Sequence, residues 1–419
     1  MIAVLCMLQA VAFVDVAVLP MDTNRVIEHQ TVVVRDGRIV EMGPAASTRV
    51  PAGATRVDGR GKFLMPGFTE MHGHLPNPAQ NAVPGIVETV LFLYVANGVT
   101  AVRGMQGNRD HLLLRDRIAS GELLGPRLWV PGPAMSGNNT TSPSEGRRRV
   151  EENKDFGYDH LKVHENLSLD TYDTIAATAK RVGLTFGGHV ASAVGVRHAL
   201  AAGQKSIDHL DNYAEEIGGD DAKRAELARV TAASGSWTVP TMALWEVFMG
   251  NESIDELAAR PELRYVPAQW VTAWRQQVAN QRQNNPADGG AAVAERRRIL
   301  KALRDAGAAI AFGTDSPQLF SVPGFSIHRE MQSMLEAGMT PFEILASGTR
   351  NVGRYYEREA EFGTVAAGRR ADLVLLNANP LADVANFSRR AGVMVTGRWL
   401  PEVEIQARLA QIATTFGAN

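Results

Sequence analysis

The sequence predicts an α/β protein: a (β/α)₈ barrel of the TIM-like type, with a small β-sandwich domain built from both termini. Three observations predict this fold. Eight short apolar segments that suit buried strands recur between residues 62 and 317. Helical segments separate them, which is the pattern of parallel βαβ units. Strand-rich segments at the two ends of the chain flank this alternating middle.

The two ends of the chain predict the small domain. Residues 14–22 and 30–44 have the character of strands, and Asp36-Gly37 inside the second segment predicts a tight hairpin turn. Residues 362–379 and 391–400 supply matching strands near the C-terminus. We therefore expect residues 1–58 and 359–419 to form the small domain, with a C-terminal helix, and residues 59–358 to form the barrel.

The predicted barrel strands follow one another with helices between them. Residues 168–183 and 193–203 are helical in character, and each ends in a glycine that can cap a helix. Residues 247–307 exceed a simple crossover, so we expect additional helices there. The predicted strands are residues 62–72, 98–105, 127–135, 160–167, 184–191, 206–213, 237–244 and 309–317.

Polar side chains stand at the carboxyl ends of several predicted strands, where catalytic residues lie in such barrels. A strand points residues i and i+2 to the same face, so His72 and His74 can reach one ion. For a single histidine elsewhere, a core imidazole bonded to a backbone carbonyl is the alternative. Imidazole and carboxylate together suit zinc or a similar divalent ion. The candidate ligands are His72, His74, Lys162, His189, His209 and Asp315.

Lys162 is unexpected beside divalent cations, because like charges repel. Burial and nearby positive charge lower a lysine's pKa and leave a free amine. Such an amine can take up CO₂ and become a carbamate, whose two oxygens can bridge two ions. A lysine that extends to the surface is the alternative, but the position of Lys162 between apolar residues of a predicted strand argues against it.

Seven motifs occur in a fixed order: "VRDGRIVEMGP", "LMPGFTEMHGH", "LKVH", "GGHV", "SIDHL", "GTDSP" and "FGTVAAGRRADLVLLNANPL". In these motifs the chain resembles the amidohydrolase superfamily, in its binuclear branch with a carboxylated lysine, and within it the imidazolonepropionase-related, prolidase-like enzymes. The resemblance implies two divalent metal ions, and we expect zinc. It places His72, His74 and Asp315 on one ion and His189 and His209 on the other, with the Lys162 carbamate between them.

The same resemblance implies an enzyme that cleaves a C–N amide bond through attack of a metal-bridging hydroxide. Asp315 takes the proton of the hydroxide and passes it to the leaving nitrogen. The expected substrate is a dipeptide of the Xaa-Pro kind or an N-acyl amino acid, including aromatic, ochratoxin-like amides. Arg103 and His164 are candidates for binding the substrate's carboxylate. For Arg103, a salt bridge between loops is the alternative.

Two other functional readings stay open. The same hydroxide can attack cyclic amides, esters or lactones. Some members of the superfamily have lost metal ligands and serve as structural proteins. All six expected ligand positions are filled in this sequence, which favours an enzyme.

The composition narrows the expected partners and location. The 43 basic and 45 acidic residues nearly cancel, so nothing indicates nucleic-acid binding. We expect a small-molecule amide as the partner and no membrane association, and the resemblance implies a homo-oligomer. Cys6 is the single cysteine, which excludes an internal disulfide. The apolar residues 1–12 have some signal-peptide character but no basic start, so a cytoplasmic and a periplasmic or secreted location both stay open.

Overall fold

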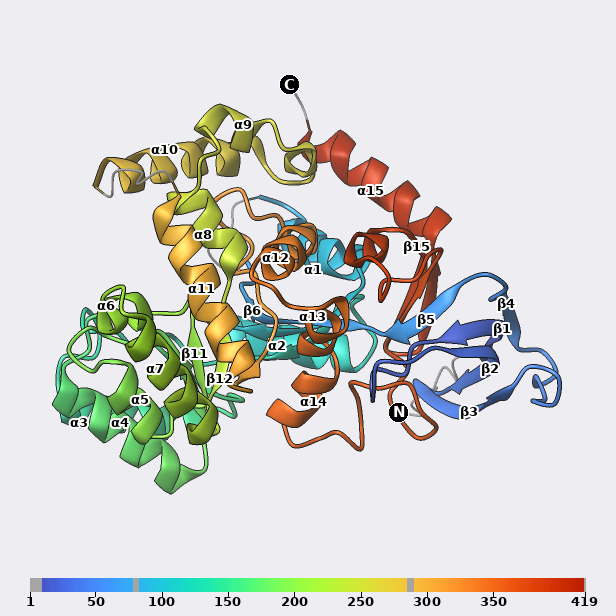
Figure 1. Cartoon of the computed structure of the whole chain (residues 1–419). Helices are drawn as coiled ribbons and strands as arrows, with labels where there is room; N and C mark the ends of the chain where they lie inside the picture. The colour runs from blue at the N-terminus through green and yellow to red at the C-terminus, as the bar shows by residue number, and fades with distance from the viewer. Residues whose placement is uncertain (1–9, 78–82, 285–289, 418–419) are drawn as a thin grey trace.

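The computed structural model describes residues 10–77, 83–284 and 290–417. Most of the segment with signal-peptide character, residues 1–9, lies outside the described residues. Within the described part, the chain folds as a mixed α/β protein whose strands form three sheets (Figure 1). No helix in this part is long and apolar enough to span a membrane.

One sheet combines strands from both ends of the chain. β14 pairs antiparallel with β5, and this pairing joins the N-terminal strands to the C-terminal ones, which lie together in Figure 1. The pairing produces one eight-stranded sheet, so the predicted sandwich stays a prediction. The strands are β1 (Val11–Val18), β2 (Ile27–Arg35), β3 (Arg38–Pro44), β4 (Thr55–Asp58), β5 (Phe63–Pro66), β14 (Leu373–Leu376), β15 (Arg390–Val395) and β16 (Arg398–Pro401).

The other two sheets are parallel and contain the predicted strands of the middle. Each of the eight predicted segments contains a strand, which confirms their number and order. The three-stranded sheet comprises β6 (Phe68–Gly73), β7 (Val99–Gly104) and β8 (Arg127–Trp129). The five-stranded sheet comprises β9 (Leu161–Val163), β10 (Phe186–Gly188), β11 (Ser206–Asp208), β12 (Trp237–Val239) and β13 (Ala309–Ile310).

Backbone contacts connect these two sheets at both of their edges. Parallel bridges pair Pro131 with His160 and Met135 with Val163, next to β8 and β9. On the other side, the Met71 N–H donates to the Phe312 carbonyl at 2.8 Å, next to β6 and β13. The carboxyl ends of strands from both sheets therefore lie near one another.

The segment 62–72 differs from the prediction of a single strand. The chain divides there into β5, which belongs to the terminal sheet, and β6, which begins the parallel strands. Gly67 separates the two, and a Cβ atom at this position would collide with the Thr100 hydroxyl oxygen. The apolar run is continuous because both strands are buried, so the sequence alone did not reveal the division.

Turn and cap residues act as predicted. Asp36 and Gly37, with φ values of 49° and 72°, form the turn between β2 and β3. Gly183 ends α4 (Leu169–Val182) with φ 70°, and the Ser168 side chain caps its start. Both glycines adopt a left-handed backbone conformation that disfavours most other residues.

Helices fill the connections between the parallel strands and follow the last of them. They are α1 (Ile86–Ala96), α2 (Arg109–Ala119), α3 (Pro143–Asp155), α5 (Val196–Ala201), α6 (Tyr213–Ile217), α7 (Asp221–Ser234), α12 (Ser326–Glu336), α13 (Pro341–Ser347) and α14 (Arg350–Tyr355). The predicted extra helices of residues 247–307 are α9 (Ile254–Ala258), α10 (Ala268–Asn284) and α11 (Ala291–Asp305), and α8 (Met242–Met249) precedes them. The predicted C-terminal helix is α15 (Glu402–Phe416).

Candidate metal centre

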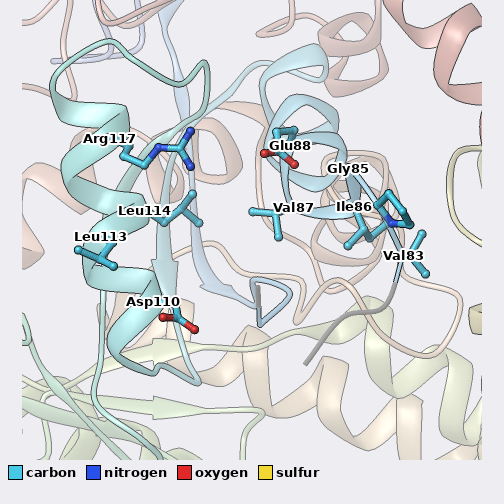
Figure 2. Close-up of a pocket in the computed structure, with 10 residues that line it drawn as sticks. Val83, Gly85, Ile86, Val87, Glu88, Asp110, Leu113, Leu114 and Arg117 are labelled. Carbon is cyan, nitrogen blue, oxygen red and sulfur yellow. The ribbon is translucent and has the colours of Figure 1, made fainter. Parts of the chain in front are cut away.

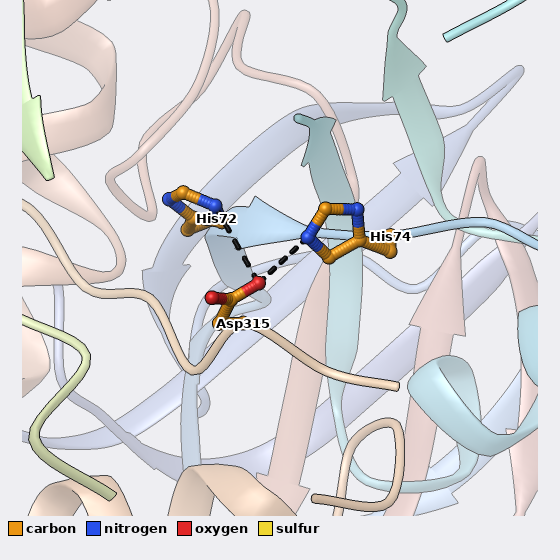
Figure 3. A group of neighbouring side chains, drawn as sticks. All are labelled: His72, His74 and Asp315. Atoms are coloured by element: carbon orange, nitrogen blue, oxygen red, sulfur yellow. Dashed lines mark hydrogen bonds and ion pairs between the residues drawn. The ribbon is translucent and has the colours of Figure 1, made fainter. Parts of the chain in front are cut away.

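His72 and His74 converge on Asp315. His72 lies in β6 and His74 follows it, while Asp315 follows β13 on the other side of the junction. The His74 Nε2 atom lies 2.6 Å from Asp315 Oδ1, and His72 Nε2 lies 3.5 Å from the same oxygen (Figure 3). The Asp315 N–H donates to the His72 carbonyl at 2.8 Å, which fixes the two segments against each other. These three side chains could hold one metal ion.

The other three predicted ligands join the same cluster. The Lys162 ammonium nitrogen lies 3.3 Å from His72 Nε2. The His209 ring centre lies 4.4 Å from that of His72 and 4.4 Å from that of His189. His209 Nδ1 also lies 3.7 Å from Asp315 Oδ2. The structure thus brings all six predicted ligands together from the ends of five strands.

The electrostatics of the cluster suit metal ligands. Burial lowers the pKa of His189 to about 3, and neighbouring positive groups add to this effect. Burial likewise holds the pKa of His72 and of His209 well below the usual histidine value. Neutral imidazoles have a free lone pair that can bind a metal ion.

Lys162 and His209 fit the expected bridged site. Lys162 is only 2% exposed, and burial lowers the pKa of its amine, although Asp208 and Asp315 act in the opposite direction. A buried amine with a lowered pKa can react with CO₂, as the carbamate prediction requires. The buried His209 Nε2 atom has no hydrogen-bond partner among the described residues. A bound ion would satisfy this atom, because buried polar atoms rarely lack a partner.

Acidic and hydroxyl groups orient three of the histidines. Asp208 Oδ2 lies 2.8 Å from His72 Nδ1, and Asp211 Oδ2 lies 2.7 Å from His189 Nδ1. The Thr241 hydroxyl lies 2.8 Å from His209 Nδ1. Such contacts fix the ring and leave the opposite nitrogen for the metal ion. The sequence analysis missed them, although Asp208 and Asp211 stand within the predicted strand segment 206–213.

Glu70 is a further buried acid that the sequence analysis missed. Its carboxylate accepts hydrogen bonds from the His72 N–H at 3.0 Å and from the Thr314 N–H at 2.8 Å. It therefore ties the backbone of β6 to the segment before Asp315. Burial raises the pKa of Glu70 to about 8 in spite of these hydrogen bonds. Its position two residues before His72 was the available signal.

Arg103 does not lie where a substrate-binding residue is expected. Its side chain is completely buried and donates to the Met71 carbonyl at 3.1 Å and to the Ser206 hydroxyl at 2.9 Å. Its Nη1 atom also lies 3.8 Å from Asp208 Oδ2. Arg103 supports the ligand-bearing strands from below their polar ends, and this location does not favour the predicted contact with a substrate carboxylate.

His164 lies beside the ligand cluster. Its ring centre is 4.1 Å from that of His189, and its Nδ1 atom accepts a hydrogen bond from the Glu165 N–H at 2.9 Å. Burial, helped by His189 and Lys162, lowers the pKa of His164 to about 3. His164 can therefore meet a substrate as a neutral hydrogen-bond donor through Nε2, and not as a cation.

A surface pocket of about 420 Å³ lies between the start of α1 and one face of α2 (Figure 2). Val87 and Leu114 supply apolar side chains, and Glu88, Asp110 and Arg117 supply charged ones. The pocket contains no histidine and none of the six candidate ligands. The candidate metal ligands therefore do not line this pocket.

Comparisons with known proteins identify relatives of this chain. An adenine deaminase from Paracoccus denitrificans (strain Pd 1222) is 24% identical over 372 residues, which are 84% of this chain and 52% of the relative. The ochratoxinase of Aspergillus niger is 26% identical over 311 residues, 66% of this chain and 54% of the relative. The chain thus spans about half the length of these two relatives.

A solved structure resembles nearly the whole chain. It is that of a candidate prolidase from Bifidobacterium longum, with a TM-score of 0.73 and 25% sequence identity. The similarity covers 97% of this chain and 100% of that one. The profile of the amidohydrolase family matches residues 63–400, which include every candidate ligand. The predicted resemblance is confirmed: the chain belongs to the amidohydrolase family.

Proposed function

We propose that this protein is a metal-dependent hydrolase that cleaves the amide bond of an N-acyl amino acid or a dipeptide. One observation carries the proposal: four imidazoles, a buried lysine and a carboxylate converge from the ends of five strands. The buried His209 Nε2 atom, which has no hydrogen-bond partner among the described residues, supports a role in metal binding. Membership of the amidohydrolase family agrees with hydrolytic chemistry.

The residues fit two divalent ions, and we expect zinc. His72, His74 and Asp315 would hold one ion, His189 and His209 the other, and a carbamate on Lys162 would join them. Together these ions would lower the pKa of a bound water and polarise the scissile carbonyl. Asp208, Asp211 and Thr241 would keep the imidazoles in the required orientation.

Asp315 is the proposed acid–base residue. Its Oδ1 atom faces His74 and His72, while its Oδ2 atom lies toward His209, so the carboxylate stands between the two halves of the ligand set. From this position it can take a proton from the attacking water and deliver it to the leaving nitrogen. His164 can donate a hydrogen bond to the substrate.

The relatives guide the choice of substrate. The names of the Bifidobacterium protein and of the Aspergillus enzyme point to a prolidase and to an enzyme acting on ochratoxin. The adenine deaminase shows that the same family also serves other chemistry. We favour a linear amide that contains an aromatic or cyclic amino acid. Hydrolysis of esters, lactones or cyclic amides, or a structural role, would be the alternative outcomes of the test.

The proposal includes the architecture around the site. We propose that the eight parallel strands close into a (β/α)₈ barrel, because backbone bonds connect both edges of the two parallel sheets. We also keep the proposed division into residues 1–58 with 359–419 and residues 59–358. The shared terminal sheet supports this division, and β5 is the strand that connects its parts.

The test is a substrate screen with the full-length protein loaded with zinc in the presence of bicarbonate. We expect hydrolysis of N-acyl amino acids or Xaa-Pro dipeptides, its loss on chelation, and its return when zinc is added. Hydrolysis of esters, lactones or cyclic amides alone would contradict the proposed substrate class. The absence of hydrolysis with every compound in the panel would favour a structural protein.

A further inference from the structure

Arg296 of α11 is a buried cation for which the described residues supply no ion-pair partner. Only 7% of the residue is exposed, and it forms no hydrogen bond or ion pair with any residue in the described part of the chain. Its guanidinium stacks on Trp245 of α8, with Cζ 3.5 Å from the ring centre. A buried charge without a partner is costly, so its retention requires a reason.

The neighbouring arginines of the same helix are paired. Arg297 contacts Glu246 at 2.7 Å, and Arg298 contacts Glu295 at 2.6 Å. Of these three consecutive arginines, Arg296 alone is directed to an aromatic ring and lacks a carboxylate within the structure described here. Glu246 and Glu295 pair with these neighbours, and within the described residues no carboxylate forms an ion pair with Arg296.

Trp245 places Arg296 on the side of the metal centre that carries His189 and His209. The Trp245 indole N–H donates to the His209 carbonyl at 2.9 Å. Burial lowers the pKa of Arg296, while the charges of Asp211 and Glu215 act in the opposite direction. Asp211 is the residue that contacts His189 at 2.7 Å. The Arg296 guanidinium therefore stacks on Trp245, which is hydrogen-bonded to His209, and lies close enough to Asp211, the partner of His189, for their charges to interact.

The helices that carry this pair are held firmly. Figure 1 shows α11 beside α8. The Glu330 carboxylate accepts hydrogen bonds from the Met242 and Ala243 N–H groups at 3.0 and 2.7 Å, which fixes the start of α8. Arg297 and Glu246 connect the two helices directly. The positions of Arg296 and Trp245 are therefore set before any ligand arrives.

We propose that Arg296, supported by Trp245, binds the free carboxylate of the substrate. This inference rests on the proposed function, since it names the group that positions the substrate for hydrolysis. A guanidinium can give two parallel hydrogen bonds to a carboxylate, which fixes the orientation of the neighbouring amide bond. A carboxylate would also supply the negative partner that Arg296 lacks.

The experiment compares an acid with its amide. N-Acetyl-L-phenylalanine and N-acetyl-L-phenylalaninamide are titrated calorimetrically into the zinc-loaded Asp315→Asn protein, in which hydrolysis is slowed. With Arg296 intact, the acid should bind more tightly. Arg296→Gln should weaken the acid by roughly 10–100-fold, because a hydrogen bond to a charged group is lost, and should change the amide by less than about threefold. Arg298→Gln on the same helix is the matched control and should change neither.

The outcomes below decide whether Arg296 binds the substrate carboxylate. Equal affinities for acid and amide with Arg296 intact would overturn the inference, and so would an equal loss for both compounds in Arg296→Gln. Arg296→Lys keeps the charge but not the planar group and should give an intermediate loss for the acid alone. If Arg296→Gln does not fold, Arg296→Lys and the comparison of acid with amide in the protein that retains Arg296 still test the inference. Acid-selective binding in a protein that hydrolyses no amide would support the inference and contradict the proposed function.

Discussion

Two buried arginines lie near the metal centre, and their partners differ. Arg103 donates to Met71 and Ser206 and its Nη1 atom approaches Asp208, so its guanidinium has polar partners in the core. Within the described part of the chain, Arg296 stacks on the face of Trp245 and forms no hydrogen bond or ion pair. The comparison indicates that burial alone does not distinguish a structural cation from a binding one. The partners of the charge distinguish them.

The largest effect is expected from removal of Lys162, because the proposed carbamate on this residue would join the two metal ions. Lys162→Ala should lower kcat/KM by about 10³-fold or more, because loss of a catalytic group and of metal ligation act together. Steady-state kinetics with the zinc-loaded protein measures this change. Lys180→Ala, which alters an exposed lysine of α4, should leave the rate unchanged. Full activity of Lys162→Ala would show that no bridge is needed.

Asp315→Asn comes next, because it keeps the shape of the side chain but removes its basicity. We expect kcat to fall by about 10²–10⁴-fold, the usual contribution of a positioned acid–base group. Asp173→Asn is the control, since Asp173 also contacts a histidine, His198, but at the surface. A fall in kcat of less than tenfold would exclude the proton-transfer role of Asp315.

Arg103→Ala tests the structural side of the comparison. Loss of its guanidinium leaves Ser206 and Asp208 buried without this partner, so the free energy of unfolding should decrease by about 3–5 kcal/mol. Denaturant titration measures it, with Arg148→Ala of an exposed pair as a control that should cost at most about 1 kcal/mol. The acid–amide preference should persist in the folded fraction. A stable Arg103→Ala protein that has lost this preference would reverse the roles of the two arginines.

The smallest effect concerns the orientation of a ligand. Asp211→Asn should weaken zinc binding by about 10–100-fold, because His189 loses the carboxylate that fixes its ring. Competition with a chromogenic chelator measures the affinity, and Asp173→Asn again serves as the surface control. An unchanged zinc affinity would show that packing alone orients His189.

The sequence predicted which side chains cluster at the candidate metal centre, because local rules were sufficient there. Polar residues such as His189 and His209 interrupt apolar strand segments at their ends, and the order of these ends places them at one edge. Arg103 stands in the same kind of position, but its long side chain reaches across the core to Ser206, which strand position cannot reveal. Arg296 could not be predicted, because its relation to Trp245 depends on how two distant helices pack.

The fold was predictable to a similar extent. The eight strands and the shared terminal sheet followed from apolar periodicity and from turn signals such as Asp36-Gly37. The division between β5 and β6 was missed, because both strands are buried and the apolar run does not change at Gly67. Asp208 and Asp211 were missed as orienting groups, because a short sequence does not show which carboxylate turns toward which ring.

The metal content of the purified protein tests the central claim most directly. Elemental analysis after growth with zinc and bicarbonate should find close to two divalent ions per chain, since the six converging residues provide ligands for two ions joined at Lys162. In the Lys162→Ala protein the content should fall, while in Lys180→Ala it should not. A folded, unmodified protein that holds only trace metal under these conditions would contradict the account.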